Sequence, residues 1–251
     1  MIPSAAGLPR IFAHRGDSGA APENTLAAFR AAIAAGADGV ELDVHASRDG
    51  VAVVIHDERL ERTTSGHGWV HDATAAELGA LEAGAWFRPP LPGQGVPTLR
   101  AVLALLRPSG LAVNIELKTA RHDYPGLVPA VLGDVEAAGM AAQVVLSSFN
   151  HRTLLEARRL APHVPCAALL YEVLVEPWRY AREHGFQAVH PHRATVDGDL
   201  VRACHAAGLA VRAWTVDDEA DARRLMALGV DGLITNRPAL LRALRDALAP
   251  G

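Results

Sequence analysis

The stretch Ala35–Val44, AGADGVELDV, joins the end of a helical segment to a run that is typical of a buried strand. Gly36 stands where helices commonly end in a glycine. The same order, a glycine after an alanine-containing helical segment and then an apolar run, recurs at Gly208 and Gly229. This alternation predicts repeated α/β units around a parallel sheet.

Eight such units cover the chain. We expect strands near residues 11–14, 38–45, 112–117, 143–148, 165–170, 187–191, 210–215 and 231–235, and helices near 24–35, 98–107, 126–138, 151–161, 175–184, 197–207, 218–228 and 238–248. Eight units in 251 residues is the size of a (β/α)8 TIM barrel. The alternative is a doubly wound open sheet, but no G-x-G-x-x-G turn follows the first strand. We therefore predict a single TIM-barrel domain over residues 1–251.

One segment interrupts this alternation after the second predicted strand. The dipeptide Asp49-Gly50 lies between two largely apolar runs, which is a hairpin signal. A two-residue turn there places His56 opposite Asp43, and a bulge would shift this pairing by one residue. Residues 60–97 then form an irregular insertion, which we expect to act as a small cap over the barrel mouth.

Charged side chains alternate with apolar ones inside two of the predicted strands. Glu41 and Asp43 lie two residues apart in one strand, and Glu116 and Lys118 do so in another. Side chains two residues apart in a strand point to the same face. Burying one charge without a partner costs on the order of several kcal/mol. A hard divalent cation would compensate the carboxylates, and a phosphate group would compensate the cations.

Composition excludes several classes of protein. The net charge of −4 and the absence of a Lys/Arg stripe exclude a nucleic-acid surface. No apolar stretch reaches the ~18–20 residues of a membrane span, and residues 1–10 lack the pattern of a signal peptide. Cys166 and Cys204 lie in apolar stretches and are expected to be reduced core residues. We expect a cytoplasmic protein, and no pattern in the sequence sets its oligomeric state.

Two histidines, an arginine and a tryptophan lie at or just past the ends of predicted strands. In a TIM barrel the C-terminal ends of the strands form the catalytic face. His14 and Arg15 end the first strand, and His56 follows the hairpin. Trp214 lies near the end of the seventh strand, where we expect it to form a wall of the substrate site.

Taken together, these motifs closely resemble the glycerophosphodiester phosphodiesterases. The resemblance spans almost the whole chain, in order: His14-Arg15-Gly16, Pro22-Glu23-Asn24-Thr25, Glu41-x-Asp43, His56-Asp57, Glu116-x-Lys118 and Trp214-Thr215-Val216. It implies a metal-dependent hydrolase that releases an alcohol and sn-glycerol 3-phosphate from small glycerophosphodiesters.

The resemblance also implies a role for each matched residue. Glu41, Asp43 and Glu116 would bind a divalent cation, Mg²⁺ or Ca²⁺. His14 and His56 would form the acid–base pair, and Arg15 and Lys118 would hold the phosphate. This set agrees with what phosphodiester hydrolysis requires, which is a base, an acid and positive charge at the phosphate oxygens.

Several of these residues have a purely structural alternative. The charged strand residues could form an internal charge network, and Arg15 could pair with Glu41 or Asp57. Asn24 is expected to be a helix N-cap. We expect His45 on the solvated hairpin, and the pair His190 and His192 at the barrel rim.

The chain departs from the family pattern at two positions. Asn236 stands where the family usually has Asp, and we expect it to cap the last helix. Ala101 stands where the family usually has Glu, which removes a capping box from the helix that begins after Thr98.

Two other functions compete with the preferred one. A lysophospholipase D-like or cyclising phospholipase activity on the same barrel would need an apolar mouth, and the 60–97 insertion offers only scattered apolar residues. A binding protein without activity is the other alternative, but it would have no need for two positioned histidines.

Overall fold

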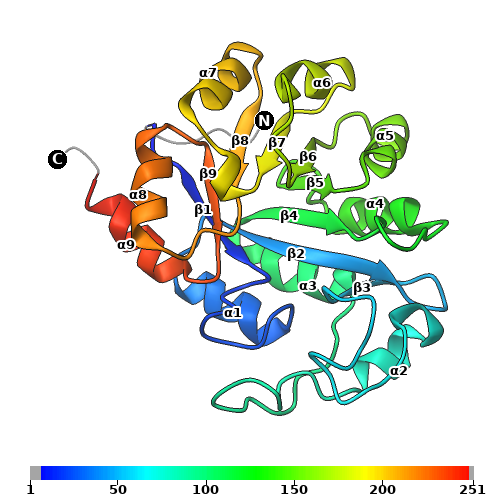
Figure 1. The fold of residues 1–251 in the computed structure, drawn as a ribbon. Coiled ribbons are helices and arrows are strands. Elements are labelled where there is room, and N and C mark those ends of the chain that lie inside the picture. The colour runs from blue at the N-terminus through cyan, green and yellow to red at the C-terminus, as the bar shows by residue number, and fades with distance from the viewer. Residues whose placement is uncertain (1–6, 249–251) are drawn as a thin grey trace.

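A ring of eight parallel strands forms the centre of the computed structural model, which describes residues 7–248. The strands are β1 (Arg10–His14), β2 (Gly39–Ala46), β4 (Ala112–Leu117), β5 (Val144–Ser148), β6 (Cys166–Leu170), β7 (Ala188–Pro191), β8 (Ala210–Ala213) and β9 (Gly232–Thr235). They pair in chain order, and β1 closes the ring by pairing with both β9 and β2. The predicted TIM barrel is confirmed (Figure 1).

Eight helices surround this ring (Figure 1). They are α1 (Leu26–Ala34), α3 (Leu99–Leu106), α4 (Leu127–Ala137), α5 (His151–Leu160), α6 (Pro177–Glu183), α7 (Gly198–Ala206), α8 (Glu219–Ala227) and α9 (Pro238–Asp246). Every second strand residue, such as Val40, Leu42 and Val44, points outward and packs against the helices in the main apolar core. The intervening residues point into the barrel, so the strand alternation decides which side chains reach the site.

The strand register of the hairpin after β2 is shifted by one residue from the predicted register. Strand β3 (Ala52–Val54) pairs antiparallel to β2 with His45 opposite Val53. Its turn holds three residues rather than two, because Gly50 takes a left-handed conformation (φ +76°) and adds a bulge. Asp43 therefore lies opposite Ile55, whose backbone N–H donates to the Asp43 carbonyl over 3.1 Å. The two-residue turn is corrected to the bulged alternative.

The insertion at residues 60–97 is present, but it lies beside the mouth of the barrel (Figure 1). It contains α2 (Ala75–Gly79) and the short 3₁₀ helix η1 (Val70–Asp72). Its apolar residues pack against β3 in a small separate core, made of Val53, Ile55, Leu60, Val70, Leu78 and Val96. None of residues 60–97 lines the cavity at the barrel mouth. Arg62 of this segment nevertheless contacts Glu23 and Asp57, and the role of the segment as a cap stays a prediction.

Two buried polar side chains lie inside the barrel below the mouth. His190 is fully buried rather than at the rim, because its position in β7 points inward. The guanidinium of Arg212 on β8 lies 3.2 Å from the His190 Nε2 atom and 5.6 Å from the centre of the Phe12 ring. Gly232 on β9 leaves the space that the Arg212 side chain occupies, since a Cβ atom there would lie 3.0 Å from its Cγ atom.

Cys166 and Cys204 are both buried and free, as the sequence predicts. Burial raises the pKa of the two thiols to about 12 and about 11. No helix within residues 7–248 combines the length and apolar character that a membrane crossing requires.

Candidate active site

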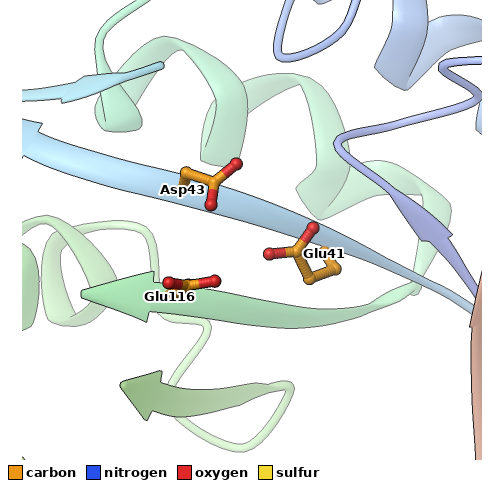
Figure 2. A group of neighbouring side chains, drawn as sticks. All are labelled: Glu41, Asp43 and Glu116. Carbon is orange, nitrogen blue, oxygen red and sulfur yellow. The ribbon is translucent and has the colours of Figure 1, made fainter. Parts of the chain in front are cut away.

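Three carboxylates converge at the C-terminal ends of β2 and β4. Glu41 and Asp43 point inward from β2, and the strand register places Asp43 directly beside Glu116 of β4. One oxygen atom of each side chain lies within 4.8 Å of the others, and all three residues are buried. Figure 2 shows the three groups facing one another between the two strands.

Two cationic side chains lie against these three carboxylates. The Lys118 ammonium donates to Glu116 over 2.8 Å and lies 3.6 Å from Asp43. The Arg15 guanidinium lies 3.4 Å from the other oxygen of Asp43. Two positive charges leave the trio one charge short of neutrality, so the site retains a demand for positive charge.

The pKa values of the carboxylates reflect this imbalance. Burial by itself would raise the pKa of Asp43, but the charges of Lys118 and Arg15 hold it far below its usual range. Burial raises the pKa of Glu116 to about 7. Burial and the neighbouring Asp43 charge raise the pKa of Glu41 well above its usual value. At least one of these groups therefore resists ionisation unless further positive charge is present.

The donor set fits a hard divalent cation. Mg²⁺ and Ca²⁺ prefer carboxylate oxygens over nitrogen or sulfur, and this cluster presents three carboxylates from rigid strands. The Asp43 Oδ1 atom is buried and accepts no hydrogen bond within the described residues. A cation between the three side chains would satisfy this atom, so the residues present fit the group.

Asn24 holds Asp43 in place rather than capping α1. Its side-chain amide donates to the Asp43 carboxylate over 2.8 Å, and its backbone is left-handed (φ +58°). Thr25 caps the helix instead, accepting from the backbone N–H of Ala28. The expectation of an Asn24 cap is corrected, because the cap lies one residue later.

The loop after β1 fixes the direction of Arg15. Its backbone N–H donates to Glu41 over 3.1 Å, and its guanidinium donates to Glu23 over 2.8 Å. Glu23 is in turn held by Arg62 over 2.7 Å. Gly16 makes this loop possible, because a Cβ atom there would lie 2.6 Å from the backbone of α1 at Ala28. The Arg15 side chain forms ion pairs with Asp43 and Glu23, rather than with Glu41 or Asp57 as the structural alternative expected.

His14 is held by Asn236. The imidazole Nδ1 atom lies 2.7 Å from the amide oxygen of Asn236, and the amide nitrogen donates to Asp217 over 2.6 Å. An amide oxygen only accepts, so His14 carries its proton on Nδ1 and keeps a lone pair on Nε2. The Nε2 atom lies 3.9 Å from Glu41. Burial, and next the Arg15 charge, lower the pKa of His14 to about 4.

This contact corrects the structural role expected for Asn236. The residue at the N-cap of α9 is Arg237, and no side chain caps that helix. Asn236 instead orients a histidine that lies 222 residues earlier in the chain, a contact for which the sequence carries no local signal.

His56 has a different partner. Its Nδ1 atom donates to Asp57 over 2.6 Å, and Arg62 holds the same carboxylate. Burial lowers the pKa of His56. His45 donates from Nε2 to the backbone carbonyl of His56 and receives the hydroxyl proton of Tyr124 at Nδ1, both over 2.9 Å. His45 is thus fully buried rather than solvated, and it positions the main chain at His56.

Two connected cavities open at this end of the barrel. The inner one has a volume of about 80 Å³ and the outer cleft a volume of about 470 Å³. His56, Glu116, Lys118 and Phe149 line both of them. The inner cavity is also lined by His14, Arg15, Glu41 and Trp214. The barrel therefore brings all the predicted site residues except Asp43 to the wall of one cavity. Asp43 lies behind this wall, in contact with Arg15.

Trp214 lines the inner cavity, and its role as a wall of the substrate site stays a prediction. Its indole N–H donates to the His190 carbonyl over 2.7 Å, which fixes the ring. The ring of Phe149, just after β5, has its centre 5.4 Å from the centre of the Trp214 ring. The sequence analysis missed Phe149, because a single aromatic residue after a strand forms no motif.

Three carboxylates that fit a divalent cation, two histidines and two cationic groups lie together on a TIM barrel, an arrangement typical of a hydrolase that acts on a phosphate ester. A family model for the glycerophosphoryl diester phosphodiesterase family matches residues 14–240. The chain belongs to this family and is a hydrolase of phosphoric diesters.

Related proteins and solved structures support the same family assignment. A glycerophosphodiester phosphodiesterase from Caldanaerobacter subterraneus is 41% identical over 92% of this chain and 95% of its own. The structure of a phosphodiesterase from Oleispira antarctica, in complex with the product sn-glycerol-3-phosphate, is 31% identical with a TM-score of 0.88, over 95% of this chain and 97% of that one. A glycerophosphodiester phosphodiesterase from Agrobacterium tumefaciens is 33% identical with a TM-score of 0.82, over 94% and 100%.

The Asn236 contact generates the first prediction. Asn236→Leu removes the acceptor and leaves the buried Nδ1–H of His14 unpaired, at a cost of about 1–3 kcal/mol. We expect kcat for glycerophosphodiester hydrolysis to fall about tenfold to hundredfold. The double variant Asn236→Asp with Asp217→Asn keeps an acceptor for His14 without placing two carboxylates side by side, so it serves as the matched variant, with a smaller loss. A wild-type kcat in Asn236→Leu would show that this contact does not orient His14 for turnover.

Proposed function

We propose that this protein hydrolyses glycerophosphodiesters to an alcohol and sn-glycerol 3-phosphate, using a divalent cation and the two histidines. The observation that supports this most strongly is that His14 and His56 border the same cavity as the carboxylate trio and the two cationic side chains. The product found in the similar Oleispira structure supports the same substrate class.

Glu41, Asp43 and Glu116 would hold the cation, Mg²⁺ or Ca²⁺. When bound, the cation supplies positive charge at the phosphate and compensates the charge that develops on its oxygens. Lys118 and Arg15 supply the remaining positive charge, and their contacts with the trio hold them at the cavity wall before substrate arrives.

The two histidines would share the two proton transfers. One takes the proton of the attacking hydroxyl, which belongs either to the glycerol C2 or to water, and the other gives a proton to the leaving alkoxide. Each imidazole is held through Nδ1, by Asn236 or by Asp57, so each has its Nε2 atom left for this exchange. Trp214 and Phe149 form the apolar walls that limit water around the reacting groups.

Cation binding is testable by stability as well as by turnover. A ligand that binds only the folded state at a hundred times its Kd stabilises it by about 2.7 kcal/mol. For a chain of this size we therefore expect Mg²⁺ or Ca²⁺ to raise Tm by about 5–10 °C. Asp43→Asn should abolish the increase, and chelation should abolish turnover. Full activity in excess chelator would contradict the cation requirement.

The two histidines are tested by separate substitutions. His14→Ala and His56→Ala should each lower kcat by about 10²–10⁴, while the cation-dependent increase in Tm is retained. His163→Ala is the matched control, because His163 lies on the surface in an ion pair with Glu136. A variant that keeps its rate within a few-fold of the wild type would remove that histidine from the mechanism.

One observation favours a second candidate, the lysophospholipase D-like activity. The loop after β6 exposes an apolar run, in which Val173 is 80% and Val175 is 92% exposed. Tyr171 at its start lies 6.1 Å from Trp214. A single acyl chain on the glycerol could leave the inner cavity along this path. The sequence did not reveal it because the apolar residues lie on this loop and not in the insertion.

This candidate generates a comparison of substrates. We expect glycerophosphocholine and lysophosphatidylcholine to be cleaved at the same bond, and Val173→Ser with Val175→Ser to lower kcat/KM for the lysolipid only. Release of choline from each substrate measures both rates. Equal effects on the two substrates would show that the loop does not contact an acyl chain.

A further inference from the structure

The outer cleft lies between two loops at the barrel mouth. The loop after β3 contributes His56 to Arg59, and the loop after β4 contributes Lys118 to Arg121. The cleft shares Lys118 and His56 with the inner cavity, so the groups assigned to the phosphate lie on the boundary between the two spaces. A diester with its phosphate at this boundary has one arm in each space.

The volumes decide which arm enters which space. The inner cavity, at about 80 Å³, suits a small three-carbon arm, and the outer cleft, at about 470 Å³, suits an arm of variable size. The glycerol is constant among glycerophosphodiesters and the headgroup alcohol varies. The glycerol therefore belongs in the inner cavity and the headgroup in the outer cleft.

Most charges that line the outer cleft already have close partners. Asp57 is bound by His56 and Arg62, and Glu116 is bound by Lys118. Arg59 donates to Glu61 over 2.6 Å and lies over the ring of Trp69 at 5.0 Å.

Glu58 and Arg121 are the exceptions, because within residues 7–248 each has only the other as an ion-pair partner. The Glu58 carboxylate is mostly buried, and its ion-pair partner is Arg121 at 3.9 Å. The Arg121 side chain is 84% exposed, and such exposed pairs contribute little. Glu58 also lies close enough to Tyr124 for its charge to add to burial in raising the pKa of that phenol to about 12. Glu58 is therefore a weakly paired negative charge in a cleft that Phe149 also lines.

We propose, resting on the function proposed above, that the outer cleft binds the headgroup and that Glu58 selects diesters with a cationic, ammonium-bearing headgroup. A carboxylate and an aromatic residue that line the same cleft give a favourable environment for a primary or quaternary ammonium. An anionic headgroup is disfavoured, because Arg59 is already neutralised and Arg121 faces Glu58.

The test compares three substrates with a common glycerol phosphate. Glycerophosphocholine and glycerophosphoethanolamine carry an ammonium, and glycerophosphoglycerol carries a neutral polar headgroup. In Glu58→Gln the ratio of kcat/KM for the ammonium diesters to kcat/KM for the neutral diester should fall about tenfold, the order expected for loss of one charged contact. Glu156→Gln, on the exposed face of α5, is the matched control and should leave the ratio at the wild-type value.

A second variant tests Glu58 by removing its ion-pair partner. Arg121→Met removes its exposed partner and should raise the same ratio, because the carboxylate becomes free to meet the headgroup. An unchanged ratio in Glu58→Gln, or a lowered ratio in Arg121→Met, would overturn the assignment of Glu58 while leaving the hydrolase intact. Failure of the wild-type protein to cleave any of the three diesters would instead overturn the proposed function, and this inference with it.

Discussion

The mutual repulsion of three buried carboxylates is the constraint on which this structure depends. Glu41, Asp43 and Glu116 have oxygen atoms within 4.8 Å of one another inside a barrel of rigid strands. Such a cluster would destabilise the fold without compensation. Lys118, Arg15 and the amide of Asn24 each contact it, so these charges tie the loops after β1 and β4 to the carboxylates of β2 and β4. The same unmet demand for positive charge makes the site suited to a divalent cation, and such a cation together with Lys118 and Arg15 would suit it to a phosphate.

The residues of the site divide into those that line the cavity and those that hold the lining side chains in place. His14 and His56 border the cavity, but each depends on a partner from elsewhere, Asn236 from the end of β9 and Asp57 from the adjacent loop position. These partners differ in kind, since one is a neutral amide and the other a carboxylate. The barrel thus places two chemically identical side chains in two different environments, which is how a single fold separates the tasks of two titratable groups.

The barrel and most of the charged residues of the site could be predicted from the sequence, because the patterns that indicate them are local. Period-two alternation in β2 and β4 put Glu41, Asp43, Glu116 and Lys118 on one face, and glycines after the helices located the strand starts. Contacts between distant segments were not predictable. Asn236 meets His14 across 222 residues, and Tyr124 buries His45 across 79. The hairpin was displaced by one residue because Gly50 adopts a left-handed conformation, a choice that the dipeptide Asp49-Gly50 leaves open.

The divalent cation proposed to lie between the three carboxylates can be located by anomalous diffraction from crystals grown with Mn²⁺, which substitutes for Mg²⁺ at oxygen-rich sites. We expect one strong anomalous peak, ligated by Glu41, Asp43 and Glu116. A trio still bridged only by Lys118 and Arg15, with the peak elsewhere or absent, would contradict it.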